Sequence, residues 1–224
     1  MADQAARLRR RFEQTVVGGP LVWFETLGDA LAWEERLWAA PAEELAVWWA
    51  ARTPALAVPR AYASAAGFED AAAASARRGW PVALRGSGGG CAPQGPGVVN
   101  LTWAPSPAQS AAGQYVIYEQ LAANIVGACG AMGVAASVFS PPSTWCRGRF
   151  DVSAGGRKLA GLSQRRRLTP APRTLAHAAL SLDLDLGPAM EAIGAFCADL
   201  GRDERPTLET STTVARVLEA GPRQ

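Results

Sequence analysis

Hydrophobic and polar positions follow the spacing of a strand in some segments of the chain and the spacing of a helix in others. Glycine or proline separates many of these segments. Short apolar runs bounded by turn residues predict strands over 45–50, 55–58, 81–84, 98–103, 134–139 and 175–184. Helical spacing predicts helices over 29–38, 67–78, 108–132 and 188–200. Residues 150–153 and 158–163 are expected to pair as a hairpin around a glycine turn. Mixed elements joined by short turns predict an α+β (α/β) domain with a mostly antiparallel sheet flanked by helices.

One long uncharged stretch, residues 121–139, raises the question of a membrane span. It consists mainly of Ala and Gly and includes Asn124 and Ser137, so it is weak for a spanning helix. We therefore interpret it as a buried helix that leads into a strand, and expect no membrane association.

Composition narrows the class of protein further. The chain has 224 residues, of which 49% are hydrophobic, which suits one large domain. A net charge of +2 does not by itself indicate a nucleic-acid partner. The N-terminal segment is charged and lacks an apolar core, so a cytoplasmic location with reduced thiols is expected. One histidine and four cysteines without a CxxC pair predict no metal site.

Lys158 is unusual because arginine supplies the other 21 of the 22 basic residues. A lysine that survives such a bias indicates a position where a compact ammonium with a tunable pKa is needed. The alternative is chance survival on a solvated turn.

Two further segments carry candidate chemistry. The loop at residues 85–90, Arg-Gly-Ser-Gly-Gly-Gly, follows a strand, and its glycines allow the backbone to approach a ligand closely. The alternative is a flexible surface turn. Cys146 lies between Arg147 and Arg149, and nearby cations favour the thiolate. Neighbouring prolines and Gly148 indicate a loop, although a buried inert cysteine is the common alternative.

Together, three blocks resemble the lipoate-protein ligase and octanoyltransferase superfamily: RGSGGG (85–90), VVNL (98–101) and GRKLAG (156–161). Residues 145–166 look most like the branch that transfers octanoyl groups from glycine cleavage H protein to other lipoyl domains. In that branch a cysteine is the nucleophile and a lysine contacts the acyl carbonyl, and Cys146 and Lys158 match these positions. The resemblance implies a class II biotin/lipoate ligase-like fold. It covers residues 20–200, with an N-terminal extension (1–19) and a C-terminal tail (201–224).

The resemblance also implies roles for other residues. Those expected to bind the acyl group or substrate are Arg85, Ser87, Gly88, Gly89, Gly90, Asn100, Gly161 and His177. His177 is either a base or a core histidine. Arg165, Arg166 and Arg167 are either a solvated edge or a surface for an acidic partner. Expected partners are lipoyl-domain proteins, namely glycine cleavage H protein and 2-oxoacid dehydrogenase acyltransferase subunits, or acyl carrier protein. No cofactor is expected.

Several departures keep two alternatives open. Ligases and several transferases carry His-Asp after the glycines, whereas residues 91–95 read Cys-Ala-Pro-Gln-Gly. Conversely, the segment from Gly148 to Asp151 resembles an element of ligases, and the context of His177 resembles that of a histidine more typical of ligases and other transferase branches. An ATP-dependent ligase would need ATP and magnesium and would make Cys146 incidental. A family member without catalysis would bind a lipoyl protein and would never become acylated.

Overall fold

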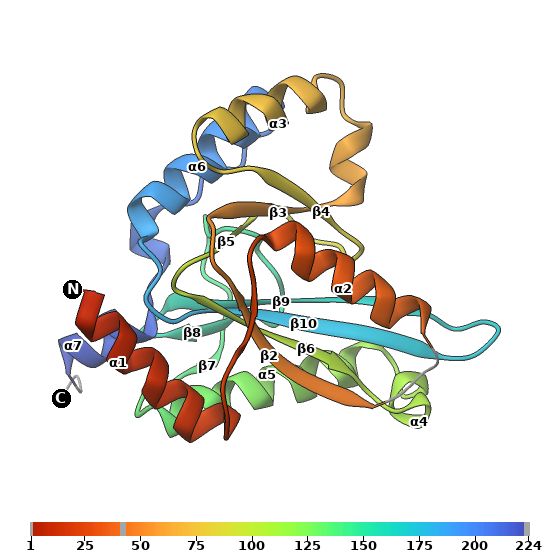
Figure 1. Cartoon of the computed structure of the whole chain (residues 1–224), viewed down its shortest axis with the longest axis vertical. Coiled ribbons are helices and arrows are strands. Elements are labelled where there is room, and N and C mark those ends of the chain that lie inside the picture. The colour runs from red at the N-terminus through yellow and green to blue at the C-terminus, as the bar shows by residue number, and fades with distance from the viewer. Residues whose placement is uncertain (1, 41–43, 222–224) are drawn as a thin grey trace.

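The computed structural model describes residues 2–40 and 44–221, and within these residues seven strands form the larger of two sheets (Figure 1). In spatial order they are β1 (Val22–Phe24), β2 (Leu45–Ala51), β6 (Val98–Ala104), β10 (Arg173–Ser181), β9 (Arg157–Arg167), β8 (Val152–Ala154) and β7 (Ser137–Val138). The β1–β2 pair is parallel and the other pairs are antiparallel. The predicted mixed, mostly antiparallel sheet is confirmed.

A smaller sheet lies against the larger one and carries the glycine loop. Its order is β4 (Val82–Arg85), β3 (Ala55–Pro59) and β5 (Ala92–Gln94), with β3 parallel to β4 and antiparallel to β5. The segment between β4 and β5 contains the glycines at 86 and 88–90. The glycine loop therefore leaves one edge of this sheet and returns to its other edge.

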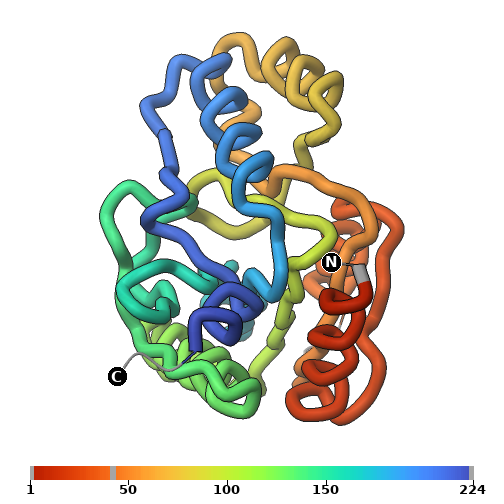
Figure 2. The backbone as a smooth tube through the Cα atoms, turned by 90° about the vertical axis from the view of Figure 1, so that its left-hand side faces the viewer, coloured from red at the N-terminus to blue at the C-terminus, as the bar shows by residue number. Residues whose placement is uncertain are grey.

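Helices cover the outer faces of both sheets (Figures 1 and 2). On the side of the smaller sheet lie α2 (Leu27–Ala39), α3 (Phe68–Arg77) and α6 (Leu186–Asp199), and beneath the larger sheet lie α4 (Pro107–Ala111) and α5 (Gln114–Ala131). The remaining helical segments are α1 (Ala2–Phe12), η1 (Glu13–Val17), η2 (Arg60–Ser64), η3 (Leu208–Thr210) and α7 (Val214–Ala220).

Two hydrophobic clusters hold these layers together. One joins α5 to the larger sheet, with Ile117, Leu121 and Ile125 all fully buried. The other joins the two sheets to α6, where Leu186 and Phe196 are fully buried. Each such side chain contributes about 1.5–3 kcal/mol when it leaves water. The second cluster surrounds the cavity described below, so it fixes the walls of the site.

The predicted elements largely agree with the structure. The helix predicted over 29–38 spans Leu27–Ala39 and begins with a capping box between Thr26 and Asp29. The predicted hairpin forms β8 and β9 around Gly155 and Gly156, whose positive φ angles of 56° and 75° suit glycine. Strand β9 continues to Arg167, four residues beyond the prediction over 158–163.

Some boundaries were predicted wrongly. The helix predicted over 108–132 is two helices, because Ala112 ends α4 and Gly113, at φ 112°, redirects the chain. The strand predicted over 134–139 is reduced to two residues. The strand predicted over 175–184 lies at Arg173–Ser181 instead. The short strands β1 and β5 were not predicted, since three-residue strands have too little periodicity to detect. The 11-residue helix α1 was also missed; it lies in the segment expected as an N-terminal extension.

The uncharged stretch at 121–139 forms the end of α5 and a turn into β7, as expected for a buried helix running into a strand. In the described part of the chain, no helix has both the length and the apolar character to cross a membrane. The domain limits at residues 20 and 200 stay a prediction. Residues beyond 200 do contact the sheet, since Thr212 N donates to Lys158 O at 2.9 Å.

Candidate active site

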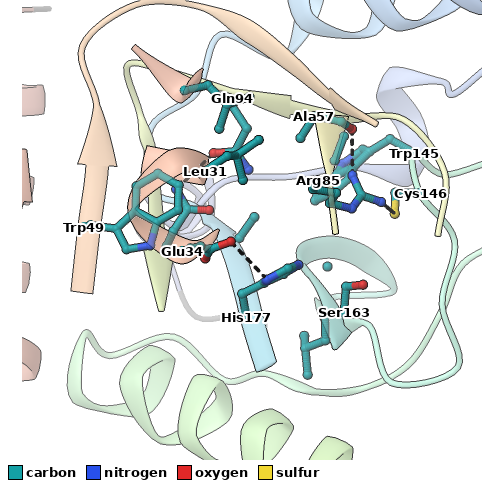
Figure 3. Close-up of a pocket in the computed structure, with 16 residues that line it drawn as sticks. Leu31, Glu34, Trp49, Ala57, Arg85, Gln94, Trp145, Cys146, Ser163 and His177 are labelled. Atoms are coloured by element: carbon teal, nitrogen blue, oxygen red, sulfur yellow. Dashed lines mark hydrogen bonds and ion pairs between the residues drawn. The ribbon is translucent and has the colours of Figure 1, made fainter. Parts of the chain in front are cut away.

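An apolar cavity lies between the two sheets, at the end where the glycine loop meets the loop that carries Cys146 (Figure 3). The space between its lining atoms, including solvent at the open mouth, is about 480 Å³, and only about 40 Å³ of it admits the centre of a water molecule. Helix α2 contributes Leu31 and Glu34, and the strands contribute most of the remaining wall. The predicted residues that line it are Arg85, Asn100, Cys146, Gly161 and His177. The structure thus brings five candidates from distant parts of the sequence to one cavity.

Arg85 ties the glycine loop to the smaller sheet. Its side chain is buried, and Nη1 donates to the carbonyl of Ala57 at 2.6 Å. Nη2 donates to the carbonyls of Gly88 and Gly90 at 3.0 and 2.7 Å. The same nitrogen lies 3.5 Å from Cys146 Sγ (Figure 3). One guanidinium therefore fixes the loop and places positive charge beside the sulfur.

Cys146 is half-buried, whereas the other three cysteines are fully buried free thiols. Its sulfur accepts a hydrogen bond from the N–H of Gly90 at 3.2 Å. Its φ of 39° is a left-handed conformation that a non-glycine residue rarely adopts. A Cβ on Gly89 would lie 2.9 Å from Sγ, so the close approach of the two loops depends on that glycine. Such strained residues cluster at functional sites.

Lys158 lies next to Cys146, but its ammonium faces the backbone. The side chain is fully buried, and Nζ donates to the carbonyls of Trp145 and Cys146 at 2.8 and 2.9 Å. It also forms an ion pair with Asp151 at 3.0 Å. Burial lowers the pKa of Lys158 and raises that of Asp151, and the ion pair opposes both shifts. Two carbonyls and one carboxylate therefore surround the ammonium in this conformation.

Trp145 separates Lys158 from the cavity. The ammonium lies 4.0 Å from the centre of the indole ring, a cation–π contact. The ring fits against Gly161, where a Cβ would approach it to 2.9 Å. Gly161 therefore leaves space beside Lys158, and in this conformation Trp145 fills it.

His177 connects the glycine loop with helix α2. Its Nε2 lies 2.7 Å from Ser87 Oγ, and Nδ1 lies 3.7 Å from Glu34 Oε2 (Figure 3). Burial and the nearby Arg85 charge lower the pKa of His177 to about 3. Burial also raises the pKa of Glu34 to about 7, although a hydrogen bond from Thr102 opposes the shift. Both groups are therefore largely uncharged in mildly acidic solution.

The far end of the cavity is polar, and several of its side chains hydrogen-bond to one another. Asn100 Nδ2 donates to Gln94 Oε1 at 2.9 Å, and Thr102 Oγ1 donates to Glu34 Oε1 at 2.6 Å. Trp49 Nε1 donates to Thr102 Oγ1 at 2.8 Å. Gln94 belongs to the segment that replaces the His-Asp of related sequences. These side chains therefore form hydrogen-bonded pairs across the polar end of the cavity.

The three arginines predicted to bind a partner lie along the distal half of β9. Arg165 donates to both carboxylate oxygens of Glu35 at 2.8 and 2.9 Å and stacks on Trp38. Arg166 donates to the carbonyl of Ser110, and Arg167 also lies over Trp38. Their role toward a partner stays a prediction.

Sequence reasoning missed three residues around Cys146. Glu34 had a detectable signal, because it lies on the buried stripe of α2 with Leu27 and Ala30. Trp145 had none beyond its position next to Cys146. Glu204 lies in the segment predicted as a tail, and only the tertiary structure brings it to the glycine loop, where Cys91 N donates to its Oε2 at 3.4 Å.

Residues 28–215 match the model of the lipoyl protein ligase A/B catalytic domain, so the chain belongs to that family. A protein of Cupriavidus necator, described as uncharacterized, is 38% identical over 138 residues, which cover 59% of this chain and 54% of that protein. An octanoyl-[GcvH]:protein N-octanoyltransferase of Kyrpidia tusciae is 28% identical over 151 residues, covering 64% of this chain and 51% of that protein. The matches therefore span about half the length of these curated relatives.

Solved structures show the same fold. Lipoate-protein ligase A bound with ATP superposes with a TM-score of 0.66 at 16% identity, covering 89% of this chain and 76% of the ligase. The bipartite lipoate protein ligase of Thermoplasma acidophilum superposes with a TM-score of 0.57 at 18% identity, covering 89% and 78%. The predicted lipoate ligase-like fold is confirmed.

Proposed function

We propose that the chain is an acyltransferase that carries an octanoyl or lipoyl group on Cys146 and delivers it to a lysine of a lipoyl domain. One observation carries the proposal. Cys146, half-buried and strained, lies between the apolar cavity and a second, open cavity on the outer side of the glycine loop. An acyl chain can thus occupy the inside while the donor and acceptor approach from outside. The octanoyltransferase relative supports this class of reaction.

The groups around the sulfur suit covalent catalysis. The Arg85 guanidinium and the Gly90 N–H both lie beside Sγ, where each can donate a hydrogen bond to the sulfur. The thiolate attacks the donor carbonyl and forms a new C–S bond. The bond to the carrier then breaks, and the leaving amine or thiolate takes up a proton. The acceptor amine next attacks the thioester, which releases the thiolate of Cys146 and forms the amide.

In this proposal the acyl chain lies in the apolar part of the cavity, which has to widen to admit it. Leu27, Leu31 and Leu162 line its walls. Each methylene buried there contributes about 0.8 kcal/mol, so a chain of eight carbons binds firmly without a charged contact.

In this proposal, Lys158 first organises the cysteine loop. Its protons are held by the carbonyls of Trp145 and Cys146 and by Asp151. It reaches an acyl carbonyl only when Trp145 moves away from Gly161. Until then, Arg85 and the Gly90 N–H are the donors nearest the sulfur, in position to stabilise an oxyanion.

An ATP-dependent ligase is the second candidate, and the open cavity favours it. Arg147 and Arg205 line this cavity beside Gly89 and Gly90, where they would meet the phosphate of an acyl-adenylate. This reaction would require ATP and magnesium and would not involve a covalent bond to Cys146.

Intact-protein mass spectrometry distinguishes the candidates. The protein is incubated with octanoylated H protein or octanoyl-acyl carrier protein, without ATP, beside Cys146→Ala and the buried-thiol control Cys129→Ala. We expect an octanoyl adduct on wild type and Cys129→Ala, and none on Cys146→Ala. A lipoyl domain added afterwards should gain the acyl group.

No adduct with either donor would reject the cysteine mechanism. Lipoylation that requires ATP would support the ligase, and binding without turnover would indicate a non-catalytic member.

A further inference from the structure

The open cavity on the outer side of Cys146 contains a carboxylate that the reaction described so far does not use. Gly89, Gly90, Cys146, Arg147, Glu204 and Arg205 are among the residues that line this cavity. Figure 2 shows the segment that follows α6, which carries Glu204, passing beside the loop that carries Cys146. Hydrogen bonds join the two, because Thr207 N and Thr210 Oγ1 both donate to the carbonyl of Ser143.

Glu204 and Cys146 approach the same glycine. Cys146 Sγ accepts the Gly90 N–H at 3.2 Å. A Cβ built on Gly90 would lie 2.9 Å from Glu204 Oε2 and 3.3 Å from Cys146 Cα. The absence of a side chain at position 90 therefore lets the carboxylate and the cysteine loop come together from two sides.

The two oxygens of Glu204 are used unequally. Oε1 accepts from Tyr62 Oη at 2.5 Å and from Arg202 Nε at 2.9 Å. Oε2 accepts only a long hydrogen bond from Cys91 N, at 3.4 Å, within the described residues. A carboxylate oxygen has two lone pairs, so Oε2 keeps acceptor capacity toward the cavity. Tyr62 and Arg202 hold the group in place, and the carboxylate is therefore pre-oriented for a donor that arrives from outside.

We propose that Glu204 binds the ammonium of the acceptor lysine and takes its proton, so that the amine reaches the Cys146 thioester as a nucleophile. The inference rests on the proposed acyl-enzyme. A free lysine has a pKa of about 10.4, so at neutral pH it must lose a proton before it attacks. Glu204 accepts that proton, the amine nitrogen bonds to the acyl carbon, and the C–S bond breaks. The thiolate of Cys146 leaves, and the amide nitrogen gives up its second proton to solvent.

The test separates the two halves of the reaction. Wild type, Glu204→Gln and the exposed control Glu209→Gln are acylated with octanoyl-acyl carrier protein, and the adduct is followed by intact mass. The acyl-enzymes are then isolated and mixed with Nα-acetyl-lysine or with hydroxylamine, which is uncharged at neutral pH. We expect acylation of all three proteins within about twofold. Transfer to Nα-acetyl-lysine should fall about 100-fold in Glu204→Gln alone, whereas transfer to hydroxylamine should be unchanged.

A pH series adds a readout that a structural role would not produce. Transfer to Nα-acetyl-lysine by Glu204→Gln should recover as pH rises and the free amine becomes abundant. Tyr62→Phe keeps the carboxylate but removes one of the two donors that orient it, so transfer to Nα-acetyl-lysine should fall less than in Glu204→Gln. Equal losses of transfer rate with both nucleophiles in Glu204→Gln would overturn the inference. Slow acylation of Glu204→Gln would also overturn it, because Glu204 would then act on the acyl donor instead of the acceptor. If wild type forms no acyl-enzyme at all, the proposed function itself fails at the first step, and the role of Glu204 fails with it.

Discussion

The ammonium of Lys158 donates a hydrogen bond to the main-chain carbonyl of Cys146, with 2.9 Å between nitrogen and oxygen. The lone lysine of the chain therefore supports the conformation of the residue that we propose as the nucleophile. Because the lysine also pairs with Asp151 and is fully buried, the arrangement has consequences for stability as well as for chemistry.

Lys158→Met should reduce the free energy of unfolding by about 3–5 kcal/mol, because it leaves the buried Asp151 without its counter-charge. Urea unfolding at neutral pH measures this loss. Lys158→Met combined with Asp151→Asn should recover a substantial part of it, since the uncompensated charge is gone. Equal stability of the single and double variants would show that the ion pair is not what Lys158 contributes.

Gly161→Ala should disturb the Trp145 side chain, because the new Cβ would approach the indole ring to 2.9 Å and Lys158 Nζ to 3.2 Å. Overpacking of this kind costs about 1–3 kcal/mol of stability. We also expect faster alkylation of Cys146 by iodoacetamide, since Trp145 and Cys146 share the loop that Lys158 holds. Gly194→Ala is the matched control, because its new methyl group would have no neighbour within 4 Å outside its own helix, and α6 tolerates alanine. An unchanged alkylation rate in Gly161→Ala would contradict the coupling.

Glu34→Gln should make the free energy of unfolding less sensitive to rising pH. The pKa of Glu34 is raised from 4.5 to about 7 in the folded protein, so the folded state keeps a proton that the unfolded chain releases. The resulting stability is present below about pH 4.5 and is lost as pH rises through 7. Between pH 5 and 8, wild type should lose about 2–3 kcal/mol relative to Glu34→Gln in urea titrations. The exposed Glu69→Gln should follow wild type, and parallel curves for all three proteins would refute the assignment.

Ala179→Leu should shorten the acyl chain that the protein accepts. Ala179 lines the apolar cavity, and a larger side chain there occupies space that the chain needs. With octanoyl and butyryl thioesters compared by intact mass, octanoylation should slow by about tenfold or more while butyrylation changes little. Ala63→Leu, at an exposed position of η2, should behave as wild type. Equal losses with both chain lengths would place the acyl group elsewhere.

Local sequence patterns were enough to predict the class of fold and to single out the residues with unusual chemistry. Periodicity located the long elements, such as the helix at Leu27–Ala39 and the hairpin of β8 and β9. The local signals were strong because capping, turn glycines and alternation act over a few residues. The lone lysine and the loop cysteine stood out for the same local reason.

Only the tertiary structure decided how these groups face one another. No local pattern places Trp145 between Lys158 and the cavity, or turns the lysine toward backbone carbonyls. Nor does any local pattern bring Glu204 to Gly90, more than a hundred residues away in sequence. Such contacts arise when the sheets and helix α6 pack together, because long-range burial and hydrogen bonding, rather than local propensity, fix the path of connecting loops.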